Sequence, residues 1–469
     1  MISRRTLFLA LGATALAGGG AYLHQALREA PEPPSPPARD ENGHLLWRNW
    51  SGSAHAYPAA RAAPASEDEL AALMRTAQGP IRVVGAGHSF MPLVPTDGTL
   101  VTLDRLAGLV HHDAATHQAT VRAGTRLGDL GPALAAIGQE MPNLPDINKQ
   151  ALGGALATAT HGTGLDVQAL HGSVTAMRLV TARGDILDID ATRQPDLFAA
   201  ARVGLGAFGV VTQVTLRNSA LTRVHKRTTI LPLEQVMAQW PRLYGAHRNA
   251  EFFALPFTGY AAVVTVDETD RPVQPRGPDR DTETLMDLKR LRDLFHLSTP
   301  VRKRVARALM ADIPPEEAVD EGWKLLSNER PVRFHEMEFH LPIEVQMAAL
   351  RDIVGTIETH RPDVFFPIEA RIIKADDAWL SPFNGRTCGS LAVHAYYKDD
   401  YRFLFELIEP IFRRYGGRPH WGKLNTLTAT DFAGLYPRWN DAMALRQALD
   451  PDGRLLNTYL KSVLQHGQP

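Results

Sequence analysis

The sequence predicts an α+β protein with more than one domain, organised around a glycine turn that follows a strand near residue 85. At 469 residues the chain is long for a single hydrophobic core. Three glycine-rich clusters, each beside a β-branched strand, lie between Val83 and Arg217. After about Ser219 the strands continue without such clusters. This change predicts a ligand-binding domain followed by a strand-rich second domain.

The overall composition is that of an ordinary globular protein. Hydrophobic residues make up 44% of the chain, charged residues 22%, and the formal net charge is −1. A near-neutral chain without a basic tract argues against a nucleic-acid partner. Cys388 is the single cysteine, which excludes an internal disulfide and any cysteine-rich metal or iron–sulfur site.

The first 30 residues have the order of an export signal. Arg4 and Arg5 precede an apolar, small-residue run from Leu7 to Tyr22, and a proline-rich linker occupies residues 31–46. The paired arginines are typical of the twin-arginine route, which carries folded proteins. We therefore expect a periplasmic or otherwise exported protein. The alternative is an uncleaved N-terminal anchor, although the segment is short and interrupted by glycine for a spanning helix.

The N-terminal part of the globular chain begins with a helix and a nucleotide-binding turn. Ser66 and Glu69 form the pattern of a capping box, which predicts a helix to about Gln78. A buried strand at 81–84 then ends in the turn 85–87. The Rossmann fingerprint requires a third glycine where this chain has Phe90. The turn is therefore of another type, and it carries an imidazole, His88.

The next elements repeat the association of glycine with strands. The second cluster spans 152–164 and the third 204–217. Their small residues allow close backbone contact with a ligand, so we expect the three clusters to form one extended binding groove. Further strands are predicted at 99–103, 119–122, 176–181 and 186–189, with a helix at 127–137.

The second domain is predicted to contain mostly strands. These lie at 251–255, 260–266, 333–341, 365–373 and 390–397, and helices follow at 401–415 and 441–449. The charged segment 279–326 has leucines at helical spacing. We expect it to form a solvated helical excursion and not a nucleic-acid surface.

Six motifs in a fixed order carry a family resemblance. They are VVGAGHSF (83–90), GGALATATHGTG (153–164), GAFGVVTQVTL (206–216), HWGK (420–423), YPRW (436–439) and ALDPDGRLLN (448–457). The chain resembles FAD-linked oxidases of the vanillyl-alcohol oxidase type, in particular aldonolactone oxidases (D-arabinono-1,4-lactone and L-gulono-1,4-lactone oxidases) and alditol oxidases. The resemblance implies a PCMH-type FAD-binding domain at 47–220, a cap domain with an antiparallel sheet at 221–418, and a C-terminal segment, 419–469, that returns to the FAD domain.

The resemblance also implies the residues that bind the cofactor. The histidine of the GHSF motif is often bonded covalently to the flavin 8α-methyl in this family, which implies the same role for His88. The implied FAD-binding residues are Val83, Val84, Gly85, Ala86, Gly87, His88, Ser89, Thr160, Thr163 and Val210.

Four further residues match the family's active site: Glu369, Arg371, His394 and Lys423. Glu369 and Arg371 are two apart on a predicted strand, so both point to one face. Oxidation of an alcohol carbon requires a group that takes the hydroxyl proton, and it requires positive charge where the flavin becomes negative. Arg371 and Lys423 can supply the charge. Either Glu369 or His394 can take the proton, because both pKa values depend on burial and neighbours.

Two departures from the alditol oxidases favour a different substrate. Those enzymes have a serine where this chain has Ala155, and a threonine where it has Tyr396. We therefore expect an aldono-1,4-lactone as substrate, with oxygen or another molecule as electron acceptor. An alditol oxidase is the nearer alternative. An exported protein that binds flavin or sugar without catalysis is the alternative of another class.

Overall fold

The computed structural model describes residues 28–278, 280–311, 313–328 and 330–465. The predicted export signal lies almost wholly outside these residues. Within the described ranges, no helix combines the length and the apolar character needed to cross a membrane.

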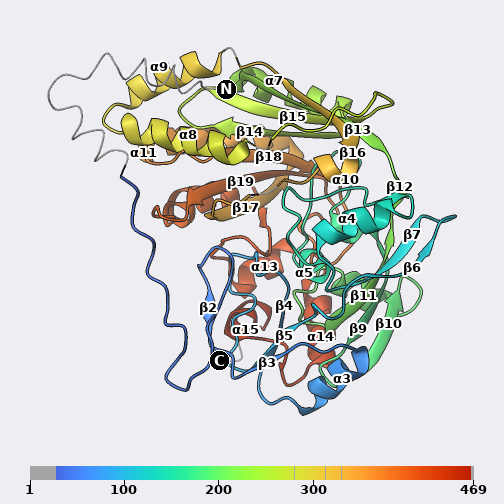
Figure 1. Cartoon of the computed structure of the whole chain (residues 1–469). Coiled ribbons are helices and arrows are strands. Elements are labelled where there is room, and N and C mark those ends of the chain that lie inside the picture. Colours follow the sequence, from blue (N-terminus) through green and yellow to red (C-terminus); the bar gives the residue numbers. More distant parts are fainter. Residues whose placement is uncertain (1–27, 279, 312, 329, 466–469) are drawn as a thin grey trace.

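Two sheets and four helices form the N-terminal domain, in the lower half of Figure 1. The first sheet is antiparallel, in the spatial order β10 (Ile186–Asp190), β9 (Val174–Val180), β11 (Val210–Arg217), β7 (Gln118–Arg122) and β6 (Leu109–Asp113). The second is parallel, in the order β3 (Ala60–Ala62), β5 (Thr99–Thr102) and β4 (Ile81–Val84). The helices are α3 (Glu67–Thr76), α4 (Leu127–Ala135), α5 (Leu152–Ala157) and α6 (Pro195–Ala201). Two short pairs, β1 (Trp47–Arg48) with β2 (His55–Ala56) and β8 (Gln139–Glu140) with β12 (Ser219–Ala220), complete it.

The capping box predicted for α3 forms only in part. The Ser66 side chain accepts from the Glu69 N–H at 3.1 Å, as predicted. The Glu69 carboxylate, however, accepts from the Ala65 N–H at 2.7 Å and not from the N-cap itself. The side chain still satisfies a backbone donor at the helix entrance, one residue earlier than the pattern implies.

An eight-stranded sheet dominates the upper half of the molecule (Figure 1). Its spatial order is β16 (Glu316–Glu321), β13 (Arg223–Pro232), β15 (Tyr260–Glu268), β14 (Asn249–Leu255), β18 (Ile368–Ile373), β19 (Cys388–Tyr396), β17 (Phe334–Pro342) and β20 (Arg418–Pro419). All neighbouring strands in it are antiparallel. Cys388 is buried at the start of β19, as expected for a small core residue.

The two faces of this sheet differ because side chains alternate along each strand. On one face, apolar residues such as Phe252, Met337 and Phe339 are fully buried. That face packs on α7 (Leu233–Ala246) and α11 (Gln346–His360), which are joined by a 2.8 Å hydrogen bond from Trp240 to Gln346. The other face, called the active face below, carries Glu369, Arg371 and His394 with their cross-strand neighbours.

The charged segment is helical only in part, because Glu316–Glu321 within it forms β16 of the eight-stranded sheet, and the expectation that its charges are solvated is also partly wrong. It forms α8 (Asp281–Leu294), α9 (Thr299–Met310) and a short α10 (Gly322–Leu325). Lys289, Arg292 and Arg302 are buried. Arg302 donates to the Pro362 and Val364 carbonyls at 2.6 and 3.0 Å. Several charged side chains of α8 and α9 are therefore buried, and Arg302 binds its helix to the second domain through these hydrogen bonds.

The C-terminal segment returns to the parallel sheet. After a π-helical turn (Leu404–Ile408) and α12 (Glu409–Arg414), it forms α13 (Ala429–Leu435), α14 (Trp439–Leu449) and α15 (Thr458–Leu464). The Phe90 N–H donates to the Gly422 carbonyl at 2.6 Å, and the Ile81 N–H donates to the Arg454 carbonyl at 2.7 Å. These bonds bring the HWGK motif beside the glycine turn that follows β4.

Candidate active site

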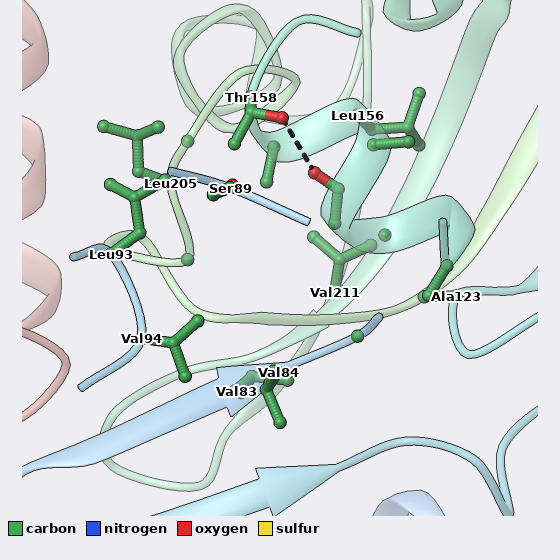
Figure 2. Close-up of a pocket in the computed structure, with 18 of the residues that line it drawn as sticks. Val83, Val84, Ser89, Leu93, Val94, Ala123, Leu156, Thr158, Leu205 and Val211 are labelled. Atoms are coloured by element: carbon green, nitrogen blue, oxygen red, sulfur yellow. Dashed lines mark hydrogen bonds between the residues drawn. The ribbon is translucent and has the colours of Figure 1, made fainter. Parts of the chain in front are cut away.

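One cavity in the N-terminal domain is lined by all three glycine clusters. Residues 85–87, 153–158 and 204–211 contribute to it, together with β4 (Figure 2). The prediction of a single extended groove is therefore confirmed. Thr158 closes the end of α5, where its hydroxyl donates to the Gly154 carbonyl at 3.2 Å. The groove is lined mostly by glycines and by small or apolar side chains. Such a lining suits a long, flat cofactor.

Glycine is needed at two positions of this cavity for different reasons. Gly87 has φ +68°, a conformation that side-chain-bearing residues rarely adopt. A Cβ at Gly154 would meet no atom within 4 Å and would project into open space at the cavity wall. The first glycine shapes the turn and the second leaves room for a ligand. Both features fit a bound dinucleotide such as FAD.

Arg82 joins three separate parts of the cavity wall, and the sequence did not indicate it. Its guanidinium donates to the carbonyls of Leu93 at 2.9 Å and Leu205 at 2.8 Å, and also to that of Leu455. Burial lowers its pKa to about 10, so the group is still charged at neutral pH. Its hydrogen bonds therefore connect the loop after the first cluster, the third cluster and the C-terminal segment.

The structure separates the predicted cofactor residues into two groups. Those that line the cavity are Val83, Val84, Gly85, Ala86, Gly87, His88, Ser89 and Val210. Thr160 and Thr163 do not line it. The Thr163 hydroxyl donates to the Ala250 carbonyl at 2.6 Å and accepts from the Ile372 N–H at 3.2 Å. It thereby links the second glycine cluster to the eight-stranded sheet.

His88 lines this cavity, with its ring stacked on Trp50 at a centroid distance of 5.1 Å. Burial, together with the charges of Lys423 and Arg126, lowers the pKa of His88 to about 4. The imidazole is therefore neutral at pH 7, and one ring nitrogen keeps the lone pair that a covalent bond to carbon would use.

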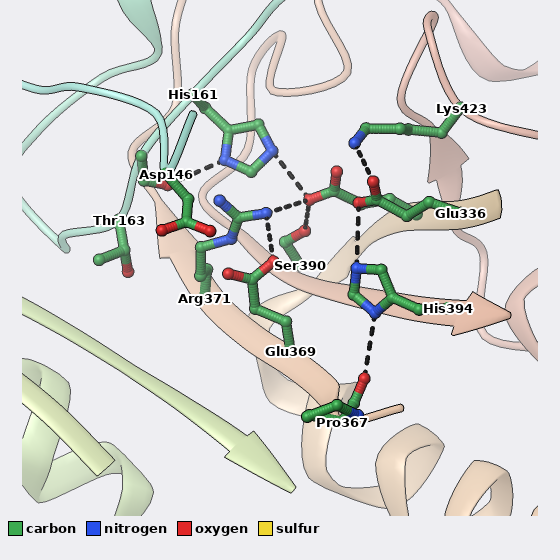
Figure 3. A network of polar contacts seen from close by, with 12 residues as sticks. Asp146, His161, Thr163, Glu336, Pro367, Glu369, Arg371, Ser390, His394 and Lys423 are labelled. Atoms are coloured by element: carbon green, nitrogen blue, oxygen red, sulfur yellow. Dashed lines mark hydrogen bonds and ion pairs between the residues drawn. The ribbon is translucent and has the colours of Figure 1, made fainter. Parts of the chain in front are cut away.

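The second group of polar residues lies on the active face, where three neighbouring strands bring it together (Figure 3). β17 contributes Glu336 and Glu338, β18 contributes Glu369 and Arg371, and β19 contributes Ser390 and His394. The register pairs Glu336 with His394 across β17 and β19. All these carboxylates and the guanidinium are at least 90% buried, so they interact strongly.

Arg371 is shared by two carboxylates. Its Nη2 lies 2.7 Å from Glu369 Oε2 and 3.2 Å from Glu338 Oε1. Glu338 also accepts from the Ser390 hydroxyl at 2.6 Å and lies 2.9 Å from His161 Nε2. Burial alone would raise the pKa of Glu338, but His161 and Arg371 hold it well below its usual value. Glu338 is therefore the ionised partner of Arg371.

Glu369 has the opposite protonation preference. Burial raises its pKa well above the usual value, and the nearby carboxylates Glu251, Asp146 and Glu338 add to the effect of burial while Arg371 opposes it. Its Oε1 is buried without a hydrogen-bond partner among the described residues. A neutral Glu369 can donate a hydrogen bond to a ligand from this position.

His394 is held in one tautomer. Its Nδ1 lies 3.0 Å from the Pro367 carbonyl, which can only accept, so Nδ1 carries the proton (Figure 3). Burial lowers its pKa, and Lys423 adds to this, while Glu336 opposes it. In the neutral ring, Nε2 therefore has a free lone pair. Glu336 Oε1 lies 3.7 Å from this nitrogen.

Lys423 connects the two groups of residues. Its ammonium pairs with Glu336 and lies 5.1 Å from the centre of the Phe90 ring. It also lines the cofactor cavity with His88, whereas Glu369 and His394 line a second cavity beyond the active face. Arg371 lines neither of these cavities but a third, smaller pocket, together with Thr163 and Glu251.

Two trios at this site have ligand atoms close enough to hold a metal ion: Glu336, Glu369 and His394, and His161, Glu338 and His420. A cation in the first would compete with Lys423, and a cation in the second with Arg371. In addition, His420 Nδ1 accepts from the Gly422 N–H at 3.0 Å, so a neutral His420 carries its proton on Nε2. The donor sets therefore fit proton exchange better than metal binding.

The sequence prediction missed Glu336 and Glu338. A signal for them exists, because Glu336, Glu338 and His340 alternate with apolar residues in a segment that was predicted to be a strand. Three polar side chains on one face of a buried strand indicate a functional surface. His161, in the second glycine cluster, contacts Glu338 and therefore lies at the edge of the same network.

Comparisons with known proteins agree with this geometry. Residues 214–463 match the family described as D-arabinono-1,4-lactone oxidase, and residues 58–190 match an FAD binding domain. An L-gulono-1,4-lactone dehydrogenase of Mycobacterium tuberculosis is 34% identical over 89% of this chain and 99% of its own length. An alditol oxidase of a Streptomyces species is 28% identical over 89% of this chain and 98% of its own length.

The fold also matches solved structures. The chain resembles the cholesterol oxidase of B. sterolicum with a TM-score of 0.73 and 17% sequence identity, over 93% of this chain and all of that one. At this identity the match establishes the fold, a PCMH-type FAD-binding domain with antiparallel sheets, and nothing of the substrate.

Proposed function

Because the chain belongs to the D-arabinono-1,4-lactone oxidase family, we propose that it oxidises a ring CH–OH group of an aldono-1,4-lactone. FAD, when bound in the glycine-lined cavity, supplies the acceptor for the hydride of that carbon. The observation that carries the proposal is a tautomer-fixed His394 that lines the second cavity and lies beside Glu336, the carboxylate paired with Lys423 of the cofactor cavity.

His394 takes the hydroxyl proton in this proposal. Its Nε2 is the acceptor end of the ring, and Glu336 at 3.7 Å stabilises the imidazolium that forms. Glu369 is the poorer base because burial raises its pKa and favours its protonated form. It instead donates a hydrogen bond that orients the substrate. The pKa of His394 is lowered and that of Glu369 is raised. His394 is therefore the base and Glu369 the hydrogen-bond donor.

Two cations, the half-buried Lys423 and the buried Arg371, provide the electrostatic part of catalysis. Lys423 lines the cofactor cavity, where a positive charge stabilises the reduced flavin. Arg371 is charged over the whole accessible pH range, and its pairing with Glu338 and Glu369 fixes its direction. A lactone carbonyl oxygen is a suitable acceptor for such a guanidinium.

We propose further that His88 forms a covalent bond to the flavin. Support comes from its place in the lining of the cavity, from its stacking on Trp50, and from a pKa lowered to about 4, which leaves a nucleophilic nitrogen at neutral pH. Flavin that stays with the protein after acid precipitation is the expected result. Release of all the flavin would contradict this assignment.

Anaerobic reduction of the flavin tests the function as a whole. Aldonolactones, open-chain polyols and sugars are mixed in turn with the oxidised protein, and the loss of flavin absorbance is followed. The proposal expects fast reduction by a lactone and slower reduction by xylitol or sorbitol. Faster reduction by a polyol favours an alditol oxidase, and no reduction by any compound favours a non-catalytic binding protein. Re-oxidation by air or by an added acceptor then separates an oxidase from a dehydrogenase.

We also propose that the protein is exported by the twin-arginine route, because Arg4 and Arg5 precede an apolar, small-residue segment. The test replaces both arginines by lysine and follows the protein by cell fractionation. The proposal expects the flavoprotein outside the cytoplasm only with the native pair. An unchanged distribution would contradict it.

A further inference from the structure

The cavity beyond the active face is larger than a free aldonolactone requires. It has a volume of about 510 Å³ and takes side chains from seven neighbouring strands, β16, β13, β15, β14, β18, β19 and β17, as well as from α8. Neighbouring strands lie about 4.8 Å apart, so seven of them extend over about 29 Å. A six-carbon lactone, with bonds of about 1.5 Å, spans only roughly 7 Å.

The chemical character of the cavity changes along this length. Glu369 and His394 lie at one end. The register places Phe253 directly beside Glu369, and Ala262 directly beside Phe253. Since each cross-strand step is about 5 Å, Ala262 lies about 10 Å from the carboxyl that faces the substrate. Along this row, from Phe253 to Ala262, the floor of the cavity is apolar, whereas charged side chains such as Lys226, Glu251 and Arg330 line other parts of it.

The opposite wall of the same part is apolar too. Leu285 and Leu288 of α8 line it, one turn apart on the helix face directed at the sheet. Leu288 is only 6% exposed. Together with Phe253, Leu255 and Ala262 they form an apolar compartment, which we define by these five residues. It is continuous with the site that holds the reacting hydroxyl.

On the basis of the proposed function, we propose that this apolar compartment binds a substituent of the substrate itself. The substrate class is then a lactone that carries an alkyl, acyl or aryl group on a hydroxyl remote from the reacting carbon. The end with Glu369 and His394 and the apolar compartment belong to one continuous cavity. Such a cavity fits a ligand that has a polar part joined to an apolar part. A bare, fully hydroxylated lactone would leave the apolar compartment filled with water.

The experiment compares L-gulono-1,4-lactone with the same lactone esterified by a hexanoyl group on its exocyclic end. Anaerobic reduction of the FAD-loaded enzyme gives the rate, and calorimetry with the dithionite-reduced enzyme, which cannot oxidise the ligand, gives Kd. We expect the ester to bind at least tenfold more tightly.

In Ala262→Phe, which fills the apolar compartment, and in Leu285→Ala, which opens its wall, the ratio of the two Kd values will fall toward one. The matched control is Leu297→Ala, since Leu297 is 76% exposed and does not line the cavity; it will keep the native ratio.

Each other outcome has a defined meaning. Equal Kd values for ester and free lactone, with normal reduction by the free lactone, overturn this inference and leave the proposed function intact. No reduction by either compound overturns both. If the apolar compartment instead serves an apolar electron acceptor, the two variants will alter re-oxidation by a quinone and leave the Kd ratio unchanged, which also overturns the inference.

Discussion

Glu336→Gln tests the idea that a second carboxylate supports the proton acceptor. The substitution keeps the shape of the side chain and removes its charge. Glu336 does not receive the proton in this scheme; it stabilises the imidazolium of His394 after transfer, across 3.7 Å. Its loss therefore weakens His394 as a base without removing the lone pair on Nε2. Glu336 is a positioning residue in this sense.

The size of the effect follows from the geometry. Two unit charges 3.7 Å apart attract by about 4.5 kcal/mol at an effective dielectric constant of about 20. Lys423, which pairs with the same carboxylate, is present in both proteins and does not change this difference. With the proton about half transferred in the transition state, about half of the attraction is lost. A loss of about 2 kcal/mol corresponds to a reduction rate about 30-fold slower.

The assay is the anaerobic rate of flavin reduction as a function of pH. His394 must be neutral to accept a proton, so the native rate falls as the pH drops through its lowered pKa. Glu336 normally raises that pKa, so the variant will show the same fall at lower pH as well as a slower maximum. Glu234→Gln is the control, because Glu234 has 77% of its side chain exposed. A native rate and an unmoved pH profile in Glu336→Gln would refute the reasoning.

Four further predictions follow from the same contacts. His394→Asn will slow flavin reduction by about 100- to 10,000-fold, and a loss under tenfold would remove it as the base. Glu369→Gln will retain activity within about fivefold, since a neutral carboxyl is replaced by a neutral amide; a collapse of the rate would mean that Glu369 is ionised. His88→Ala will fold and bind FAD, but acid precipitation will release the flavin, and flavin that remains attached would exclude His88 as the anchor. Asp376→Ala will destabilise the fold by about 3–5 kcal/mol, because it leaves a buried histidine without the partner 2.7 Å away. Burial raises the pKa of Asp376, but His171 and the Ser381 hydroxyl outweigh it, and the pKa is lowered. In the native protein the stability that the Asp376–His171 pair contributes is therefore present at neutral pH and is lost on acidification. Denaturant melts at pH 7 and at about pH 2, below the ordinary carboxyl pKa, check both statements, and equal unfolding free energies for variant and native protein at pH 7 would contradict them.

The cofactor side of the molecule could be predicted from local patterns. A β-branched run before Gly85 and small residues from Leu152 onward report local backbone geometry, and the structure brings those segments to one cavity. Thr163 shows the limit of this reasoning. It belongs to a cofactor motif, yet its hydroxyl bonds to Ala250 and Ile372, partners that only the packing of the two domains defines.

The substrate side could be predicted only in part, because it depends on strand register. Glu369 and Arg371 were identified as a pair two residues apart, and the structure places them on one face. Glu336 lies 58 residues before His394 in the chain, and it reaches that ring only because β17 pairs with β19 in one particular register. Alternation along a strand indicates which residues share a face. It does not indicate which strand is the neighbour.

The active face also has a consequence for directed evolution. The groups that face the substrate come from alternate positions of one sheet, whereas the groups that line the FAD cavity come from glycine loops elsewhere in the chain. A codon library limited to every second position of β14 and β15 would therefore sample new substrate shapes while leaving the flavin environment unaltered. The intervening positions, such as Phe252 and Ala261, are fully buried against the other layer, and randomising them would mostly yield unstable protein.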